Sequence, residues 1–248
     1  MHERWIAKWL GVVDYEYAWR LQDNLADKIA SGIRPPTLLL LEHPPTYTIG
    51  RRGNRENLLW DEAQLEQRGV SLHWVDRGGD ITYHGPGQLV GYPLLRLGPV
   101  SAQASPLKNA HRLPQGDYIG YLRRLERALI VALAHLGVEG IQVKDLTGVW
   151  VRGKKNLKGQ AEGQEIAKIA AIGVKVDSRC VSRHGFALNV NPDKSYWDGI
   201  IACGLKDYAA ISLEDVLDIV PPMEQVIEAV LKGFRQAFGV HIDEIEGL

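Results

Sequence analysis

The chain is poor in cysteine, in net charge and in long apolar runs. Its 248 residues include 2 cysteines, too few for a disulfide framework, so each thiol is expected to be buried or chemically active in a reducing cytoplasm. The formal net charge of -1 and the lack of a basic block argue against binding nucleic acid through its phosphates. The longest apolar run, Thr37 to Leu41, is too short to span a membrane, and the N-terminus lacks the apolar region of a signal peptide. No cluster of His, Cys and Asp has metal-ligand spacing, so no metal is expected.

The sequence predicts one domain over residues 1–248 of the α/β (α+β) class, with helices flanking a mixed sheet. Helices are expected over 14–30, over 118–136, from Ser212 and from Pro222 to 238. Strands are expected over 37–41, 73–75, 80–84, 89–95, 148–151, 166–176 and 186–190, with 73–75, 80–84 and 89–95 in one sheet. Residues 97–116 predict an exposed insertion or mobile loop, and 154–164 a polar hairpin tip.

The segment Arg77–Pro93, R-G-G-D-I-T-Y-H-G-P-G-Q-L-V-G-Y-P, is the most informative in the chain. It holds five glycines around a short β-favouring run, and glycine lets a backbone approach a ligand closely. Arg77, His84 and Gln88 are attached to it, which indicates the wall of a pocket. The alternative is a simple hairpin with a tight G-P-G turn, which needs fewer glycines.

This segment resembles the signature of the lipoyl (octanoyl) transferases, and the resemblance covers most of the chain. Further matching motifs are E-H-P-P-T-Y-T-I-G-R-R-G (42–53), T-G-V-W-V (147–151), A-K-I-A-A-I-G-V (167–174), H-G-F-A-L-N-V (184–190) and A-C-G-L (202–205). The resemblance implies the catalytic fold of biotin and lipoate protein ligases. It also implies transfer of octanoyl from octanoyl-acyl carrier protein to a specific lysine of lipoyl-domain proteins or of the glycine-cleavage H protein. No cofactor is expected, and nothing demands more than a monomer.

Lys168 is a candidate acid–base group in the expected strand over 165–176. Strict alternation would place it on one face with five apolar side chains, Ile166, Ala170, Ile172, Val174 and Val176. A lysine buried there is costly unless it has a partner, and desolvation would favour its neutral amine. A snorkelling lysine near a strand end is the alternative. In the resembling family the lysine of K-I-A-A-I-G pairs with the catalytic cysteine, which favours the catalytic role.

Either cysteine can be a nucleophile on composition alone. Cys203 ends an apolar run beside Gly204, whereas Cys180 lies in a polar stretch with two arginines nearby. The family's nucleophile lies in P-C-G, which Ala202-Cys203-Gly204 matches, so the resemblance assigns Cys203 as the acyl-thioester nucleophile. Lys168 is then expected to favour its thiolate and to act as acid and base. Alanine in place of proline is expected to loosen this turn, because proline fixes φ.

The resemblance also implies which residues bind the acyl substrate. They are Arg77, Gly78, Gly79, Asp80, Ile81, Thr82, Tyr83, His84, Ala171, Ile172, Gly173, Gly185, Phe186 and Ala187. His184 is a further candidate for the pocket and is expected to share a strand face with Phe186, whereas His43 is expected to be structural. A Cys–His pair is the alternative to Lys168 as base. Backbone N–H groups near Gly78, Gly79 and Gly204 are expected to hold the oxyanion.

Three other functions fit parts of the sequence. An ATP-dependent lipoate or biotin protein ligase shares the implied fold, but the chain has no G-x-x-x-x-G-K-[ST] phosphate loop. An amidotransferase would move octanoyl between lipoyl-type proteins. A non-catalytic relative would only bind carrier proteins, and the retained Lys168 and Cys203 argue against it. Arg51, Arg52 and Arg55 form a basic cluster that suits an acidic carrier or is simply a solvated loop.

Overall fold

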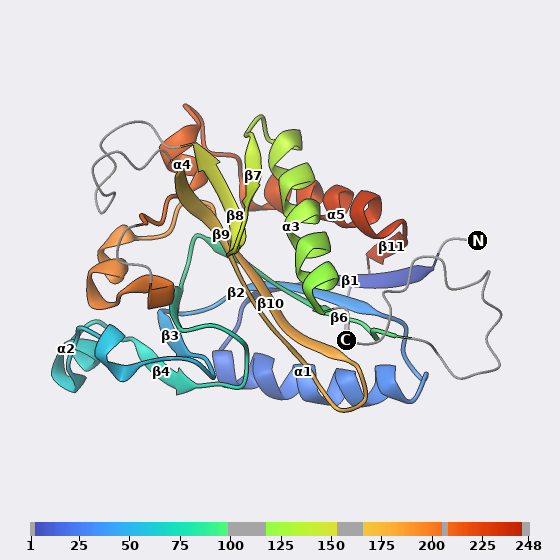
Figure 1. Ribbon diagram of the computed structural model, residues 1–248, viewed down its shortest axis with the longest axis horizontal. Helices are drawn as coiled ribbons and strands as arrows, with labels where there is room; N and C mark the ends of the chain where they lie inside the picture. The colour runs from blue at the N-terminus through green and yellow to red at the C-terminus, as the bar shows by residue number, and fades with distance from the viewer. Residues whose placement is uncertain (1–2, 99–117, 153–165, 205–207, 245–248) are drawn as a thin grey trace.

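Two β-sheets with helices packed on them make up the computed structural model, which describes residues 3–98, 118–152, 166–204 and 208–244 (Figure 1). Within these residues the larger sheet has eight strands in the order β11-β1-β2-β6-β10-β9-β8-β7, and the smaller has three in the order β4-β3-β5. The strands of the larger sheet are β1 (Arg4–Val12), β2 (Thr37–Glu42), β6 (Gln88–Leu94), β7 (Gly140–Val143), β8 (Leu146–Arg152), β9 (Ile166–Val176), β10 (Ser182–Asn189) and β11 (His241–Glu244). Those of the smaller sheet are β3 (Thr46–Ile49), β4 (Ser71–Trp74) and β5 (Ile81–His84). Both sheets contain parallel and antiparallel pairs, so the predicted mixed α/β architecture is confirmed.

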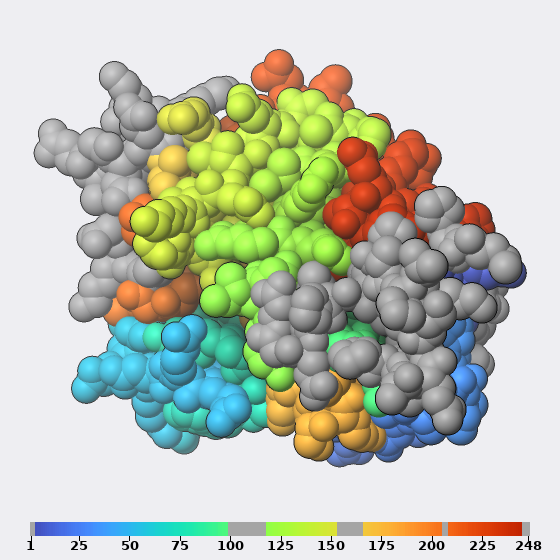
Figure 2. Space-filling view, turned by 45° about the vertical axis from the view of Figure 1, so that its right-hand side comes forward, coloured from blue at the N-terminus to red at the C-terminus, as the bar shows by residue number. Residues whose placement is uncertain are grey.

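Helices cover both faces of the larger sheet (Figure 1). Helix α1 (Tyr15–Ala30) lies on one face, and α3 (Tyr118–His135) and α5 (Met223–Phe238) lie together on the other. Shorter helices connect the strands: α2 (Glu62–Gln67), α4 (Leu213–Val216), η1 (Arg55–Asn57), η3 (Lys194–Gly199) and η4 (Ala202–Gly204). Segments distant in sequence therefore share one surface, where Figure 2 shows the cyan segment with α2 beside the orange segment that carries η3 and η4.

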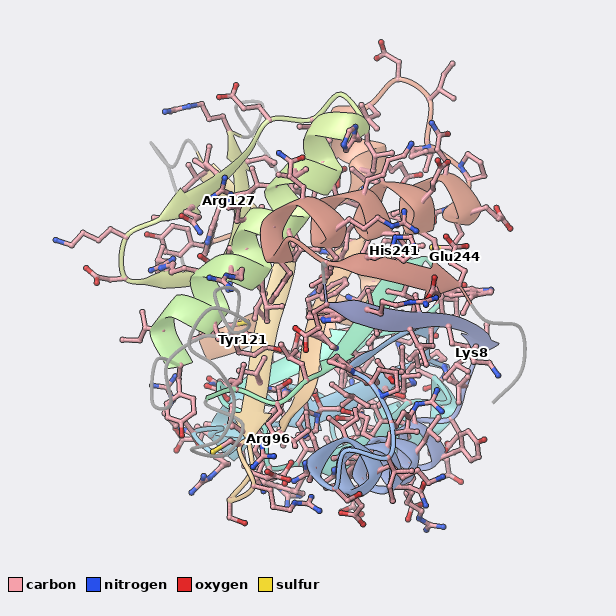
Figure 3. The ribbon with its side chains drawn as sticks, turned by 90° about the vertical axis from the view of Figure 1, so that its right-hand side faces the viewer. Lys8, Arg96, Tyr121, Arg127, His241 and Glu244 are labelled. Atoms are coloured by element: carbon pink, nitrogen blue, oxygen red, sulfur yellow. The ribbon has the colours of Figure 1, made fainter. Side chains whose placement is uncertain are left out.

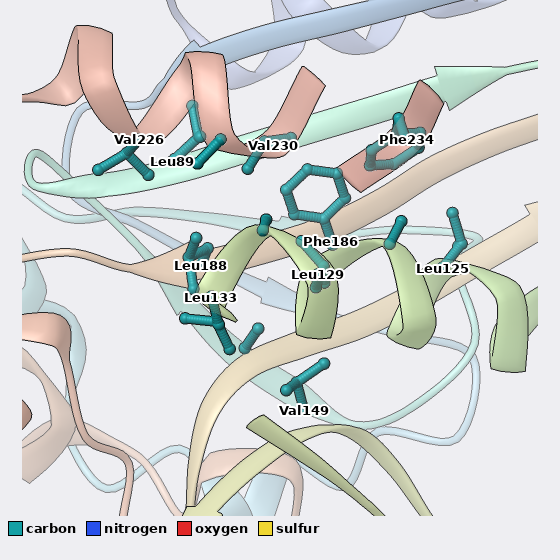
Figure 4. Packing of buried hydrophobic residues seen from close by; sticks show 14 of the residues in the cluster. Leu89, Leu125, Leu129, Leu133, Val149, Phe186, Leu188, Val226, Val230 and Phe234 are labelled. Carbon is teal, nitrogen blue, oxygen red and sulfur yellow. The ribbon is translucent and has the colours of Figure 1, made fainter. Parts of the chain in front are cut away.

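The apolar run in β2 explains why this strand is buried on both faces. Leu39 and Leu41 pack in the cluster under α1, whereas Leu38 and Leu40 pack in the cluster under α3 and α5. A strand covered on both faces has a continuous apolar run in place of alternation. Figure 4 shows the second cluster, in which leucines of α3 and the ring of Phe234 in α5 meet side chains of the sheet.

The predicted helix boundaries follow from local capping chemistry and are confirmed. The side chain of Asp14 accepts a hydrogen bond from the Tyr17 N–H at 3.0 Å, which satisfies one of the free donors of the first turn of α1. Helix α5 follows Pro222 and ends at Gly239, whose φ of 66° is left-handed. Both signals lie within a few residues of the boundary, which is why the sequence reveals them.

The prediction that 73–75, 80–84 and 89–95 share one sheet is wrong. Strands β4 and β5 belong to the smaller sheet, whereas β6 lies in the larger sheet between β2 and β10. The chain changes sheets at Gly85-Pro86-Gly87, where Gly87 has a φ of 82° and a Cβ would lie 2.6 Å from the Asn191 carbonyl oxygen. The turn is therefore a crossover packed against another loop, and not the turn of a hairpin.

Four strands were not predicted: β1, β3, β7 and β11. Strands β1 and β11 lie near opposite ends of the sequence and pair in parallel, with Arg4 opposite His241. Figure 3 shows the two strands side by side. Strands β3, β7 and β11 have four residues each and are too short to show a strong periodicity of their own. The predicted insertion at 97–116 lies outside the described residues apart from 97 and 98, and the predicted hairpin tip at 154–164 lies wholly outside them. Leu97 itself is buried in the core under α3.

Candidate active site

A cavity of about 290 Å³ lies where the two sheets meet, and it gathers most of the predicted site residues. Fifteen of the seventeen predicted residues line it: Arg77, Gly78, Gly79, Asp80, Thr82, His84, Lys168, Ala171, Ile172, Gly173, His184, Gly185, Phe186, Ala187 and Cys203. They come from β5, β9, β10, the loop before β5 and the turn at η4. Residues more than 120 positions apart in sequence therefore form one wall.

Ile81 and Tyr83 are the two predicted substrate-binding residues that do not line the cavity. Side chains alternate along β5, so Thr82 and His84 face the cavity while Ile81 and Tyr83 face the other way. Both of these are buried in the core of the smaller sheet, where the Tyr83 ring stacks on Tyr196 with 5.0 Å between centroids. Their side chains therefore hold β5 in place from behind, and their role in substrate binding stays a prediction.

An irregularity in β9 decides where Lys168 points. Trp150 pairs with Lys168 and the preceding Val149 pairs with Ala170, so Ile169 is an extra residue in the ladder. Consecutive residues Ile169 and Ala170 both lie in the core under α3, and the alternation is inverted beyond them. The predicted face was therefore wrong: Lys168 does not share a face with Ala170, but lines the cavity near Ala171.

Two backbone hydrogen bonds fix the main chain of Lys168, and its side chain lies over one aromatic ring. Its N–H donates to the Ala209 carbonyl at 2.9 Å, and its carbonyl accepts from the Ile211 N–H at 3.0 Å. The ammonium lies 4.8 Å from the centroid of the Trp150 ring, a favourable cation–π distance. Lys168 is only partly buried, so the cation remains accessible from the cavity.

Cys203 occupies a strained turn that points its thiol into the cavity. Its φ of 58° is left-handed, and Gly204 follows with 67°. A Cβ on Gly204 would lie 2.8 Å from Asp80 Oδ2, so glycine allows the turn to pack against β5. The N–H of Gly204 closes the turn by donating to the Ile201 carbonyl at 3.0 Å. Ala202, which stands where the family pattern has proline, packs against the core of the smaller sheet.

Asp80 supports this turn from the loop before β5. Its Oδ2 accepts from Asn57 Nδ2 at 2.6 Å, and its Oδ1 accepts from its neighbour's N–H, that of Ile81, at 2.7 Å. The carbonyl of Asn57 in turn accepts from the Ile201 N–H at 2.8 Å. Asp80 and Asn57 thus fix the backbone that precedes Cys203.

Arg77 contributes a buried cation to the cavity that Cys203 also lines. The residue is 7% exposed, and its guanidinium donates to the Thr48 carbonyl at 2.6 Å and to the Gly78 carbonyl at 3.0 Å. Burial lowers the pKa of Arg77 below its ordinary value, and nearby groups including Cys203 oppose that shift. Arg77 and Cys203 thus line the same cavity.

His184 reaches the cavity because its backbone is also left-handed. Its φ of 56° breaks the alternation of β10, so it contacts Trp19 of α1 while Phe186 faces the opposite core. The predicted shared face with Phe186 is therefore wrong. His184 Nε2 lies 2.7 Å from Asp76 Oδ1, and burial lowers the pKa of the imidazole. A neutral ring that donates from Nε2 to this carboxylate leaves Nδ1 as an acceptor, and this buried nitrogen has no hydrogen-bond partner among the described residues.

The other histidine and cysteine predictions can also be located. His43 contacts the Val13 carbonyl at 2.6 Å and the hydroxyl of the lining residue Tyr92 at 2.7 Å, but does not itself line the cavity, so its expected structural role is consistent with the fold. Burial lowers the pKa of His43 to about 4. Cys180 lies in the turn after β9 and does not line the cavity.

Two of the three predicted oxyanion donors are already engaged. The Gly78 N–H donates to the Val174 carbonyl and that of Gly204 to the Ile201 carbonyl, each at 3.0 Å. Gly79 is left as the candidate donor, because no backbone acceptor for its N–H is found among the described residues. Its φ of 89° lets it line the cavity.

Some lining residues were not predicted: Tyr15, Arg52, Tyr92, Leu122, Asp145, Leu146, Thr147 and Val174. Tyr15 begins α1 and Leu122 lies in α3, so the two helices reach the cavity from opposite sides of the larger sheet. Helical periodicity indicates only that such residues are apolar and inward-facing. Thr147 stood in a quoted motif but had no assigned role.

Comparison with known proteins identifies the family. Residues 14–235 match the lipoyl protein ligase A/B catalytic domain. The octanoyltransferase of Rubrobacter xylanophilus is 44% identical over 230 residues, which cover 92% of this chain and 91% of that protein. This chain belongs to the octanoyltransferase family. The octanoyltransferase of Chloroflexus aggregans is 42% identical over 230 residues, covering 92% of each chain. The expected class of enzyme, an acyltransferase, is thereby confirmed.

Solved structures support the predicted fold. A lipoate-protein ligase A bound with ATP aligns with a TM-score of 0.66 over 99% of this chain and 90% of that one, at 17% identity. A bipartite lipoate protein ligase from Thermoplasma acidophilum, studied with its E2 lipoyl domain, aligns with a TM-score of 0.65 over 99% and 88%, also at 17% identity. At this identity the likeness concerns the fold alone, and it confirms the expected ligase-like catalytic fold.

The described residues bear on two further expectations. No group of three or more His, Cys, Asp or Glu side chains in the described ranges is placed to hold a metal ion. None of the helices that the structure describes is both long and apolar enough to cross a membrane.

Proposed function

We propose that this chain transfers an octanoyl group from octanoyl-acyl carrier protein to a specific lysine of lipoyl-domain proteins, the glycine-cleavage H protein included. The reaction is the first step of protein lipoylation and proceeds through an acyl-enzyme on Cys203. The observation that carries the proposal is the convergence of Cys203, Lys168 and Arg77 on one cavity, in a chain 44% identical to an octanoyltransferase. We further propose that it acts as a cytoplasmic monomer without a cofactor.

The first half-reaction forms the acyl-enzyme. The Cys203 thiolate, stabilised by the cations of Arg77 and Lys168, attacks the thioester carbonyl carbon. The C–S bond to the carrier breaks, and the Lys168 ammonium gives its proton to the departing carrier thiolate. Gly79 lines the cavity, and its N–H can donate to the oxyanion that forms in between.

The second half-reaction passes the octanoyl group to the lysine. The incoming amine attacks the acyl-enzyme carbonyl, the C–S bond to Cys203 breaks and an amide forms. Lys168, now a neutral amine, takes the proton that the nucleophilic nitrogen loses. Lys168 thereby returns to its cationic form and Cys203 to its thiolate, ready for the next carrier.

Small residues in two adjacent strands leave room for the eight-carbon chain. Ala171 and Gly173 of β9 lie opposite Ala187 and Gly185 of β10, and all four line the cavity. A Cβ on Gly185 would lie 2.1 Å from the Gly91 carbonyl oxygen, so a larger residue is not tolerated there. Burial of the acyl chain at about 0.8 kcal/mol per CH₂ supplies several kcal/mol of binding, which makes chain length the natural basis of specificity.

The proposal is tested by mass spectrometry of the intact protein and its peptides after brief mixing with octanoyl-carrier protein, without ATP. One octanoyl adduct on the Cys203 peptide, discharged by added lipoyl domain, is expected. Cys203→Ser should lose most of the transfer rate, and Cys180→Ser is the matched control. An adduct on Cys180 would overturn the choice of nucleophile. Transfer that requires ATP and free octanoate would identify a ligase instead. Transfer of octanoyl from one lipoyl domain to another would identify an amidotransferase.

A further inference from the structure

A chain of hydrogen bonds runs behind the cavity from His84 to the segment that pairs with Lys168. His84 Nδ1 lies 2.8 Å from Gln88 Oε1, and Gln88 Nε2 donates to Asn189 Oδ1 at 2.9 Å. Asn189 Nδ2 donates to the Ile211 carbonyl at 2.8 Å. His84, Gln88 and Asn189 are each at most 7% exposed, so water does not compete for these bonds.

The backbone carbonyl at the end of this chain fixes the direction of every bond in it. A carbonyl oxygen only accepts, so Asn189 must present its amino group to Ile211. Its Oδ1 then faces Gln88, which must present its own amino group in turn. The Gln88 Oε1 that is left accepts from His84, so His84 carries its proton on Nδ1.

The opposite nitrogen of the ring, Nε2, then has a free lone pair. His84 lines the cavity, so this acceptor is available to a ligand. The charged and titratable groups around the ring are Tyr15, whose ring stacks at 6.1 Å, His43 at 5.8 Å, Arg77 and His184. Burial, together with His43, Arg77 and His184, lowers the pKa of His84 to about 3, so the ring is neutral.

We propose that Gln88 and Asn189 are positioning residues that hold His84 in its Nδ1-protonated tautomer, so that Nε2 accepts a hydrogen bond from an N–H group of the bound substrate. The octanoyl chain has no hydrogen-bond donor, so the N–H that His84 accepts from belongs to one of two groups that come close to the reacting carbonyl. These are an amide of the carrier's pantetheine arm and the amine of the acceptor lysine. The identity of this donor group rests on the proposed function.

The same chain of bonds also positions the general base. The Ile211 carbonyl accepts from Asn189 Nδ2, and the Ile211 N–H donates to the Lys168 carbonyl at 3.0 Å. Ala209 accepts from the Lys168 N–H on the other side at 2.9 Å. Asn189 therefore connects His84, the hydrogen-bond acceptor in the cavity, to the backbone of Ile211, which is hydrogen-bonded to Lys168.

Nitrogen NMR on the full chain with ¹⁵N-labelled histidine tests the tautomer without any substrate. The expected spectrum has His84 with a protonated Nδ1 and a bare Nε2, unchanged across the neutral pH range, with His84→Asn used for assignment. A protonated Nε2, or an equal mixture of tautomers, would overturn the proposal. Because the protein is ligand-free, this result does not depend on the proposed function.

Half-reaction kinetics test the role in the site and identify the donor. Gln88→Met removes both hydrogen bonds at similar volume and should release the second tautomer. It should slow one half-reaction about 3- to 10-fold, as expected for one lost hydrogen bond. Slower acylation of Cys203 assigns the pantetheine arm, and slower discharge assigns the lysine. Gln142→Met, which removes an exposed glutamine bonded to the Arg123 carbonyl, is the matched control.

The possible results separate the two proposals. Unchanged rates of both half-reactions in folded Gln88→Met would refute the positioning role. If that variant does not fold, the wild-type spectrum still decides the tautomer of His84. A shift of the bare Nε2 signal on adding octanoyl-pantetheine or the lysine peptide then shows which group donates to His84. A wild-type chain that forms no acyl-enzyme would refute the transferase, while the spectrum would still stand.

Discussion

Replacing Asp76 by Asn should destabilise the protein in a way that depends on pH. Asp76 lies between β4 and β5, where its carboxylate contacts His184 at 2.7 Å, Arg183 at 2.8 Å and the Lys175 ammonium. Burial alone would raise its pKa, but the hydrogen bonds from His184 and Lys175 outweigh it and lower the pKa from 3.8 to about 2. The side chain is 27% exposed, so solvent screens these contacts little.

The size and the pH range of the effect follow from that shift. A fall in pKa from 3.8 to about 2 corresponds to about 2 kcal/mol of stabilisation by the ionised carboxylate. Because the folded-state pKa is below the unfolded one, this stabilisation is fully present above the unfolded value. It is lost as the pH falls from about 5 to below 2, where the carboxylate becomes protonated in both states.

The assay is urea denaturation of wild type and Asp76→Asn between pH 7 and pH 3. The variant should be about 2 kcal/mol less stable at pH 7, and the difference should shrink steadily below pH 4. Asp218→Asn, at an exposed position, is the control and should differ little from wild type at any pH. A loss that is the same at pH 7 and pH 3 would refute the electrostatic reasoning and leave only a packing effect.

Three further predictions concern the base, a helix cap and the crossover turn. Lys168→Met should slow discharge of the octanoyl-enzyme about 100-fold or more, measured by single-turnover kinetics, while Lys232→Met on the exposed face of α5 should not. Asp14→Ala should cost about 1 kcal/mol in urea denaturation, since it removes the cap of α1. Gly87→Ala should cost more than about 1 kcal/mol by the same assay, because of its positive φ and the contact with the Asn191 carbonyl. Wild-type stability in either variant would contradict the assigned role.

The sequence predicted elements whose signals are local. Asp14, the apolar stripe of α1 and the Pro222 and Gly239 boundaries of α5 lie within a few residues of what they specify. The glycine-rich segment also pointed to a pocket wall, because glycines at these positions are required by close backbone approach. The β4–β5–β6 region was misassigned, since pairing partners depend on strands elsewhere in the chain and not on the run itself.

The sequence by itself determined the longer helices, the main strands and the family, and it named the candidates for the residues that carry chemistry. Tertiary structure decided which of them face the cavity. The extra residue Ile169 in β9 turns Lys168 towards the cavity, and the left-handed φ of His184 moves it to the face opposite Phe186. Periodicity cannot reveal either, because a bulge is created by pairing with β8 and a strained φ is held by contacts with α1. Asn189 and Asp76 gave no local signal, for their roles exist only once distant strands meet.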